Sequence, residues 1–180
     1  REEQDEFAFQ SQQKMGKAMA EGRFDEQIVP ISIPVRRGEP VVFKTDEHPR
    51  PETTKEGLTK LSAVFLEGGS VTAGSSSGLN DAASAVVIMS RQKADELGIK
   101  PLAKVVAQAV AGVDPNIMGI GPVPATQKAL KKANLALEDM DIIEINEAFA
   151  AQVIACDREL KMNPDKVNVN GGAISHGHPL

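Results

Sequence analysis

The sequence contains no tryptophan, no tyrosine and only one cysteine, Cys156. A single cysteine excludes an internal disulfide and is typical of a reducing compartment. A hydrophobic core must therefore be built from aliphatic side chains and six phenylalanines. No apolar run is long enough to span a membrane, and the acidic start REEQDEFAFQ is not a signal peptide. These absences favour a soluble, cytoplasmic protein.

An excess of positive charge is also missing. Lysine and arginine number 20 against 25 acidic residues, which gives a net charge of −5. Nucleic-acid binding needs a basic face that displaces counterions, so the composition argues against it. The early part of the chain could still receive a phosphate through a few basic residues, although solvated surface charge is the simpler interpretation. These residues are Arg36, Arg37, Lys44 and Arg50.

The 180 residues are 41% hydrophobic and 25% charged, which suits one domain or two small ones. The first stretch predicts a helix that ends near Gly22, because acidic residues crowd its first turn and apolar residues share one stripe. The helix starts at the first residue without a cap, which indicates a longer parent chain. A strand over 31–35 is interrupted by Pro34 and is therefore expected at an edge. The polar segment 46–54 predicts an exposed loop.

From residue 70 onward, predicted helices and strands alternate. Helices are expected over 79–85, 93–98, 124–135 and 147–160, and strands over 86–89, 102–112, 141–146 and 167–170. This order predicts an α/β protein with a parallel or mostly parallel sheet covered by helices.

Two of the predicted strands end in polar residues. If they are neighbours, Asn146, Glu147 and the loop 171–179 face one crevice, because ligands gather at the carboxyl ends of parallel strands. The Asn146 amide can donate to a developing oxyanion. It can equally cap the following helix, and the residues alone favour the cap.

The chain ends with two histidines in GGAISHGHPL. His176 and His178 could hold a metal if the segment were extended, but its glycines indicate a loop, and no further ligands lie near in sequence. We therefore expect no metal site. His178 lies between Gly177 and Pro179, where a helix is expected to start, a position that suits a general base. A surface histidine in a turn is an equally good interpretation.

Three other stretches contain residues that could bind a ligand or take part in chemistry. The loop 72–81, TAGSSSGLND, could cradle a phosphate with its backbone amides, or simply permit close packing. The loop 118–124, MGIGPVP, allows a similar backbone approach without a clear purpose. Cys156 has apolar neighbours at helical spacing and is expected to be a buried hydrophobe rather than a nucleophile.

Five stretches together resemble the thiolase family: REEQDEFAFQSQQK, VTAGSSSGLND, MGIGPVPATQKAL, INEAFAAQ and NVNGGAISHGHPL. They occur in the family's order at about its spacing, and NEAFA followed by GGA-x-x-x-GHP is a highly specific combination. The resemblance implies part of a thiolase-like layered α/β/α/β/α fold. Residues 1–69 resemble the later part of a loop domain that covers coenzyme A. Residues 70–97 resemble the end of the first half, and 98–180 the larger part of the second half, which ends in the GHP loop.

The resemblance also implies roles for individual residues. His178 corresponds to the base that activates the nucleophilic cysteine, and Asn146 to the residue that holds an oxyanion-hole water. The implied coenzyme A and acyl contacts are Arg50, Ser77, Met118 and Phe149. His176 occupies a position that is often aliphatic in the family. LSAVF at 61–65 departs from the family's pattern, which often has arginine and proline before the phenylalanine.

The implied reaction is a reversible two-step acyl exchange between a 3-ketoacyl-CoA and coenzyme A through a cysteine acyl-enzyme. The resemblance places both family cysteines outside these residues, so this segment alone is expected to be inactive. It implies coenzyme A as a substrate rather than a bound cofactor, and the remainder of a thiolase chain and a homodimer or homotetramer as partners. The alternative is a non-catalytic thiolase-like binding or assembly protein.

Overall fold

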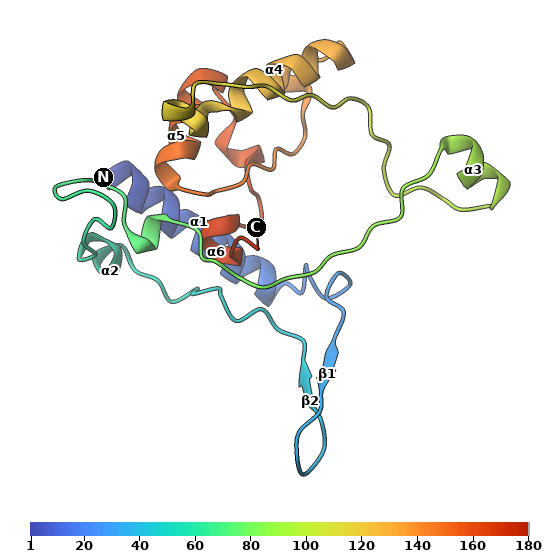
Figure 1. The fold of residues 1–180 in the computed structure, drawn as a ribbon, viewed down its shortest axis with the longest axis horizontal. Coiled ribbons are helices and arrows are strands. Elements are labelled where there is room, and N and C mark those ends of the chain that lie inside the picture. Colours follow the sequence, from blue (N-terminus) through green and yellow to red (C-terminus); the bar gives the residue numbers. More distant parts are fainter. Residues whose placement is uncertain (180) are drawn as a thin grey trace.

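The computed structural model describes residues 1–179, and Figure 1 shows their arrangement. The helix α1 (Glu2–Ala20) lies at the centre, with α2 (Lys55–Thr59), α5 (Ala150–Leu160) and α6 (Ala173–His176) packed around it. The helix α4 (Pro122–Ala133) packs on α5, and α3 (Arg91–Glu96) lies apart on long extended segments. Short 3-10 helices are η1 (Ala73–Ser75), η2 (Pro115–Ile120), η3 (Leu137–Asp139) and η4 (Pro164–Lys166).

The predicted first helix is confirmed, and it carries the core. Ala8 on α1 and Ala150 on α5 are fully buried, which lets the two helices approach closely. Leu58 and Ile174 complete this cluster from α2 and α6. Burying each such aliphatic side chain contributes about 1.5–3 kcal/mol. Helix α1 thereby fixes the position of α6, which ends two residues before His178.

A hairpin projects from this core (Figure 1). The strands β1 (Ile31–Ile33) and β2 (Val41–Phe43) pair antiparallel, and their side chains are exposed. The predicted strand before Pro34 is therefore confirmed, and it lies at an edge because the sheet has two strands. The hairpin carries Arg36 and Arg37 in its exposed connection.

The expected parallel sheet is reduced to isolated bridges among the described residues. Ile143 pairs in parallel with Val167, and Leu79 pairs in parallel with His178. The segments 141–146 and 167–170 are therefore parallel neighbours, although they form an isolated bridge and not the two predicted strands. This pairing brings the Asn146 segment beside the loop that carries the histidines.

Besides the strands expected over 141–146 and 167–170, three further element predictions are wrong in this structure. The segments 86–89 and 102–112 form no strand, and 79–85 forms no helix. Val86 and Val110 are 83% and 90% exposed, so no neighbouring chain among the described residues covers them. Strand propensity reflects the fit to a half-buried pleated surface, and without adjacent strands that preference is not realised. A short helix likewise needs a packed face, which 79–85 lacks.

The remaining helix predictions are confirmed. The helix α3 ends before Gly98, which adopts a positive φ of 64°. The helix α4 starts with Pro122 in its first turn, where a missing amide hydrogen does no harm. The helix α5 ends at Leu160, and the next residue, Lys161, is left-handed. No helix in the described part of the chain is long and apolar enough to cross a membrane.

Candidate functional site

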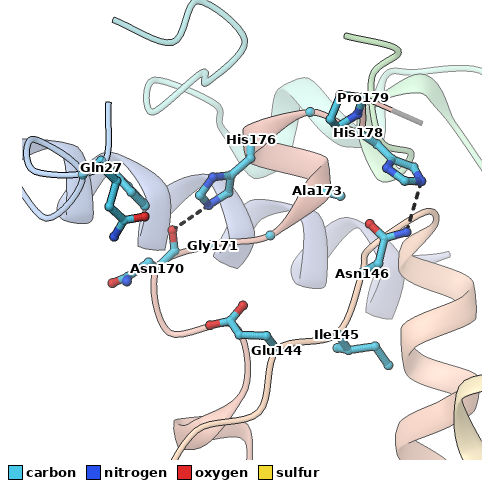
Figure 2. A pocket seen from close by; sticks show the side chains of 13 residues that line it. Gln27, Glu144, Ile145, Asn146, Asn170, Gly171, Ala173, His176, His178 and Pro179 are labelled. Atoms are coloured by element: carbon cyan, nitrogen blue, oxygen red, sulfur yellow. Dashed lines mark hydrogen bonds between the residues drawn. The ribbon is translucent and has the colours of Figure 1, made fainter. Parts of the chain in front are cut away.

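Asn146 and His178 meet at one end of the parallel pairing, as Figure 2 shows. The Nδ2 atom of Asn146 lies 3.3 Å from Nε2 of His178. An amide nitrogen donates hydrogen bonds, so this contact is a hydrogen bond in the tautomer that leaves Nε2 free to accept. The backbone of His178 is fixed separately, because its N–H donates to the carbonyl of Gly78 at 2.9 Å. The structure thus brings together two residues that lie 32 positions apart in the sequence.

The helix-capping interpretation of Asn146 is wrong. The helix α5 begins at Ala150, its N-cap position is Phe149, and no side chain bonds its free amides. Asn146 lies three residues before that cap, so its side chain is too far back in the chain to satisfy the first turn. Its amide points to His178 instead (Figure 2).

The two histidines have different partners and do not form a metal pair. His176 Nε2 lies 3.1 Å from the carbonyl oxygen of Asn170, and its ring meets Phe24 edge-on at 5.3 Å. His178 faces Asn146. Within residues 1–179, no three His, Cys, Asp or Glu side chains are placed to hold a metal ion. The glycine-rich segment also contains one helical turn, α6, where a wholly irregular loop was predicted.

The expected helix after Pro179 lies outside the described residues. The structure contains one helical turn in this segment, α6, which ends at His176 and so precedes His178. Gly177 follows with a φ of 93°, a left-handed conformation that favours glycine. A β-carbon there would lie 2.2 Å from Oδ1 of Asn80, so only glycine fits between α6 and His178.

A cavity of about 520 Å³ opens beside the pair. The residues 144–146, 170–173 and 176–179 line most of it, together with Phe24 and Gln27. Burial at its wall raises the pKa of the Glu144 carboxyl, His176 lowers it, and Glu147 raises it again. The cavity therefore has an amide donor and an imidazole acceptor on one side and a carboxyl group on the other.

Glu147 does not face this crevice, so that prediction is wrong. Its side chain is only 1% exposed, and it accepts hydrogen bonds from Ser11, Asn168 and the backbone of Ile174. Alternation along an extended segment points Asn146 and Glu147 to opposite sides, which places the amide in the cavity and the carboxylate in the protein interior.

Ser77 and Phe149, two of the candidate ligand contacts, are brought close to the pair. The N–H of Ser77 donates to the carbonyl of Ala148 at 3.0 Å, and Ser76 bridges Phe149. The ring of Phe149 meets Phe65 edge-on at 5.6 Å. These contacts hold Ser77, Phe149 and Phe65 beside one another, while none of the three lines the cavity.

Arg50 and Met118 lie farther out. The backbone N–H of Arg50 donates to Gln12 Oε1, and the Gln12 amide in turn donates to the carbonyl of Ile174. The Arg50 residue itself is exposed, as is Met118, which is 77% exposed on η2. Neither side chain contacts His178 or Asn146 through a hydrogen bond among the described residues.

The small-residue loop 72–81 uses some of its backbone amides within the protein. Thr72 caps η1, and the amide of Ser75 is bonded to the Thr72 hydroxyl and carbonyl. The amide of Ser77 is bonded to the carbonyl of Ala148. These bonds hold the loop close to the Phe149 segment, and the phosphate cradle stays a prediction.

Cys156 behaves as the sequence predicts. The thiol is fully buried on α5 and donates a hydrogen bond to the carbonyl of Gly119 at 3.3 Å. Burial raises the pKa of this thiol above its usual value. A neutral, buried thiol is not a nucleophile.

The sequence did not identify three residues whose side chains hydrogen-bond the backbone next to the site. His48 Nε2 lies 3.2 Å from the carbonyl of Ile174, and Gln12 bonds the same oxygen. Asn168 holds both backbone groups of Ile145 with its amide. Asn168 lies on a predicted strand, Gln12 in the predicted first helix and His48 in the predicted exposed loop. None of these positions reveals the hydrogen-bond partner.

An imidazole and an amide donor beside a cavity can move a proton and stabilise negative charge on a carbonyl oxygen, which is the chemistry that acyl transfer needs. Profiles described as "Thiolase, N-terminal domain" and "Thiolase, C-terminal domain" match residues 1–92 and 99–180. The chain belongs to the thiolase family, and its fold is part of the thiolase fold.

Named relatives agree with this assignment. The acetyl-CoA acetyltransferase of Syntrophomonas wolfei is 58% identical over 184 residues, which cover 100% of this chain and 46% of the relative. The beta-ketoadipyl-CoA thiolase of Acinetobacter baylyi is 54% identical over 182 residues, which cover 100% of this chain and 45% of the relative. The chain therefore spans less than half the length of these relatives.

Solved structures match closely. The acetyl-CoA acetyltransferase of Bacillus anthracis superposes with a TM-score of 0.96 at 55% identity over 99% of this chain and 45% of that one. Human mitochondrial 3-ketoacyl-CoA thiolase in complex with CoA superposes with a TM-score of 0.93 at 50% identity over 99% of this chain and 44% of that one. The exposed segments 86–89 and 102–112 belong to this matched fold.

Proposed function

We propose that this chain forms part of an acyl-CoA C-acyltransferase that cleaves 3-ketoacyl-CoA with coenzyme A and, in reverse, condenses two acetyl-CoA molecules. The observation that carries the proposal is the 3.3 Å approach of Asn146 to His178 beside a cavity, in a chain of the thiolase family. Relatives named acetyl-CoA acetyltransferase and beta-ketoadipyl-CoA thiolase support the substrate class.

In this proposal His178 is the base that takes the proton from a cysteine thiol, which then attacks the keto carbonyl. The Asn146 amide donates to the oxyanion, directly or through a water. Cleavage of the bond between the α-carbon and that carbonyl leaves the electron pair on the α-carbon, which takes a proton from the second family cysteine to give acetyl-CoA. The acyl group then passes from the nucleophilic cysteine to the sulfur of a second coenzyme A, which gives up its thiol proton. Cys156 is buried and neutral, so the nucleophile is supplied by residues outside this sequence.

Coenzyme A is a substrate here, not a permanently held cofactor. We assign its contacts to Ser77 and Phe149, which lie next to the site, and to Arg50 and Met118, which are exposed around it. The solved relative in complex with CoA supports this ligand class. The same proposal includes a cytoplasmic homodimer or homotetramer.

The proposed domain division is the one expected from the sequence. Residues 1–69 form the later part of the coenzyme A-covering loop domain, 70–97 the end of the first half and 98–180 the larger part of the second half.

The test is acetoacetyl-CoA thiolysis by the full-length protein and its His178→Ala variant. Removing a general base lowers the rate by about 10²–10⁴-fold, so kcat is expected to fall in that range while coenzyme A binding changes little. His176→Ala is the matched control, because that ring faces Asn170 rather than Asn146. An unchanged kcat in His178→Ala contradicts the base role, and an inactive wild type favours a non-catalytic binding or assembly protein.

A further inference from the structure

The buried carboxylate of Glu147 is not explained by the proposed chemistry. Ser11 Oγ donates to Oε2 at 2.7 Å, the N–H of Ile174 donates to the same oxygen at 3.1 Å, and Asn168 Nδ2 donates to Oε1 at 2.7 Å. Every partner of the carboxylate is therefore a donor, and each of its two oxygens is engaged. The side chain is 1% exposed and does not line the cavity, so it does not touch a substrate there.

These donors belong to three separate parts of the chain. Ser11 is on α1, Ile174 is on α6, and Asn168 follows the Ile143–Val167 bridge. Asn168 also accepts from the Ile145 N–H and donates to the Ile145 carbonyl, both at 2.9 Å. The carboxylate thus joins the segment that carries Asn146 to the helical turn that leads to His178.

The fit between these parts leaves no free space. A β-carbon on Gly172 would lie 2.3 Å from Cδ of Glu147, so the start of α6 rests directly on the carboxylate. The Gly172 N–H also donates to Ser11 Oγ at 3.2 Å, and Ser11 lies 2.9 Å from the hydroxyl of Ser175. Glu147 therefore fixes the position and the orientation of α6, the helical turn that precedes His178.

Burying a carboxylate costs more free energy than burying an apolar side chain. Removing a charge from water costs several kcal/mol even after relaxation, and an apolar side chain of similar volume is often at least as stabilising. Within residues 1–179, no lysine, arginine or histidine forms an ion pair with Glu147. Three directional hydrogen bonds give what an apolar residue does not give, which is one defined arrangement of the segments.

We propose that Glu147 is a positioning residue that holds His178 within hydrogen-bond reach of Asn146. The proposal rests on the proposed function only in assuming that this pair performs the chemistry. Glu147 acts through the turn at Gly172–Ile174, on one side, and through its direct peptide link to Asn146 on the other. It neither donates nor accepts a proton from the substrate.

The test compares Glu147→Gln with the wild type in the full-length protein. Glutamine keeps the shape but turns one acceptor oxygen into an NH₂ group that faces the donors of Ser11, Ile174 or Asn168. We expect kcat to fall at least tenfold while the KM for coenzyme A stays within about twofold, because the ligand contacts lie elsewhere. In crystal structures, the distance from Asn146 Nδ2 to His178 Nε2 is expected to lengthen beyond hydrogen-bond range.

Val153→Ala is the matched control for a merely structural effect. Val153 is 1% exposed on α5, so its truncation lowers stability without changing a hydrogen bond of the cluster. The two variants are assayed well below their unfolding midpoints. Loss of kcat in Glu147→Gln alone supports the proposal, whereas an equal loss in both variants overturns it.

Two further results separate the possible failures. If Glu147→Gln does not fold, Ser11→Ala removes one donor and leaves the carboxylate in place, with a smaller lengthening of the same distance expected. The crystallographic distance also decides the matter if the wild type shows no turnover, which would count against the proposed function alone. An Asn146–His178 distance that is unchanged in the glutamine variant, or in Ser11→Ala where that variant replaces it, overturns the positioning role.

Discussion

At the scale of single residues, the neighbours of a side chain decide what it does. Asn146 and Glu147 are adjacent in sequence, yet one faces a cavity and the other is buried under three donors. The sequence places both where a predicted strand gives way to a predicted helix, and for Asn146 it favours a helix cap over an oxyanion donor. The absence of a side-chain cap on α5 and the 3.3 Å contact with His178 make that choice for Asn146.

Replacing Asn146 separates these two roles experimentally. Loss of one oxyanion donor lowers kcat by about 10²–10³-fold, so we expect Asn146→Ala to do so in the full-length protein. A lost helix cap costs about 0.5–2 kcal/mol of stability, whereas Asn146→Ala is expected to leave the free energy of unfolding nearly unchanged. The measurements are steady-state thiolysis and urea denaturation. Marked destabilisation with normal turnover would restore the capping interpretation.

Cys156 allows a second test at this scale. The folded protein keeps the thiol buried and raises its pKa, so a disulfide reagent is expected to label it slowly until urea unfolds the chain. The neutral thiol also contributes stability, which is complete below the unfolded pKa of about 8.5 and is lost as pH rises through the higher folded pKa.

The control for this test is Cys156→Ala, whose free energy of unfolding should lack that cysteine-dependent loss above about pH 8.5. Rapid labelling of the native protein at neutral pH would show that the thiol is accessible.

At the scale of elements, glycines determine how α6 is placed. Gly177 takes a left-handed conformation beside Asn80, and Gly172 lies against Glu147. The sequence shows the glycines of GGAISHGHP and predicts a loop, but the helical turn inside it depends on contacts with α1 and Glu147. The hydrogen bond from Gly172 to Ser11 on α1 spans 161 positions, and the one from Ile174 to Glu147 spans 27. Periodicity along the chain reveals neither contact.

Gly172→Ala tests this packing directly. The added methyl group would overlap buried Glu147, and overpacking of this kind costs about 1–3 kcal/mol. We expect the midpoint of urea unfolding to fall accordingly. Gly112→Ala is the control, because its β-carbon would meet nothing within 4 Å. That variant is expected to be neutral or slightly more stable, and equal destabilisation of both variants would contradict the packing argument.

At the scale of the whole molecule, the structure has a packed core and long uncovered segments. The core is made by α1 with α2, α5 and α6, while 80–89 and 100–112 donate no backbone hydrogen bond among the described residues. Apolar side chains such as Leu102 and Val110 are fully or nearly fully exposed. These segments match solved thiolases, in which the matched residues make up less than half of the chain.

Hydrogen exchange is expected to show this division in the 180-residue polypeptide. Amides of α1 should exchange slowly, because they are bonded within a helix that forms the core. Amides over 100–112 should exchange within seconds, because they lack partners. Mass spectrometry of peptic fragments measures both, and α4 serves as an internal reference of intermediate burial. Slow exchange over 100–112 would show that these segments find a partner that this structure does not contain.

The sequence by itself determined the thiolase family, the helices α1, α4 and α5 and the residue types at the site, because these depend on motifs and on the periodicity of neighbouring residues. That the segments 141–146 and 167–170 are neighbours entered only as a condition, which the structure fulfils. Only the tertiary structure decided that Asn146 reaches His178, that His176 turns to Asn170 and that Glu147 is buried behind them. Those outcomes depend on the packing of α1 against α6. This is a long-range contact, and its register is set by how the side chains fit together rather than by local sequence.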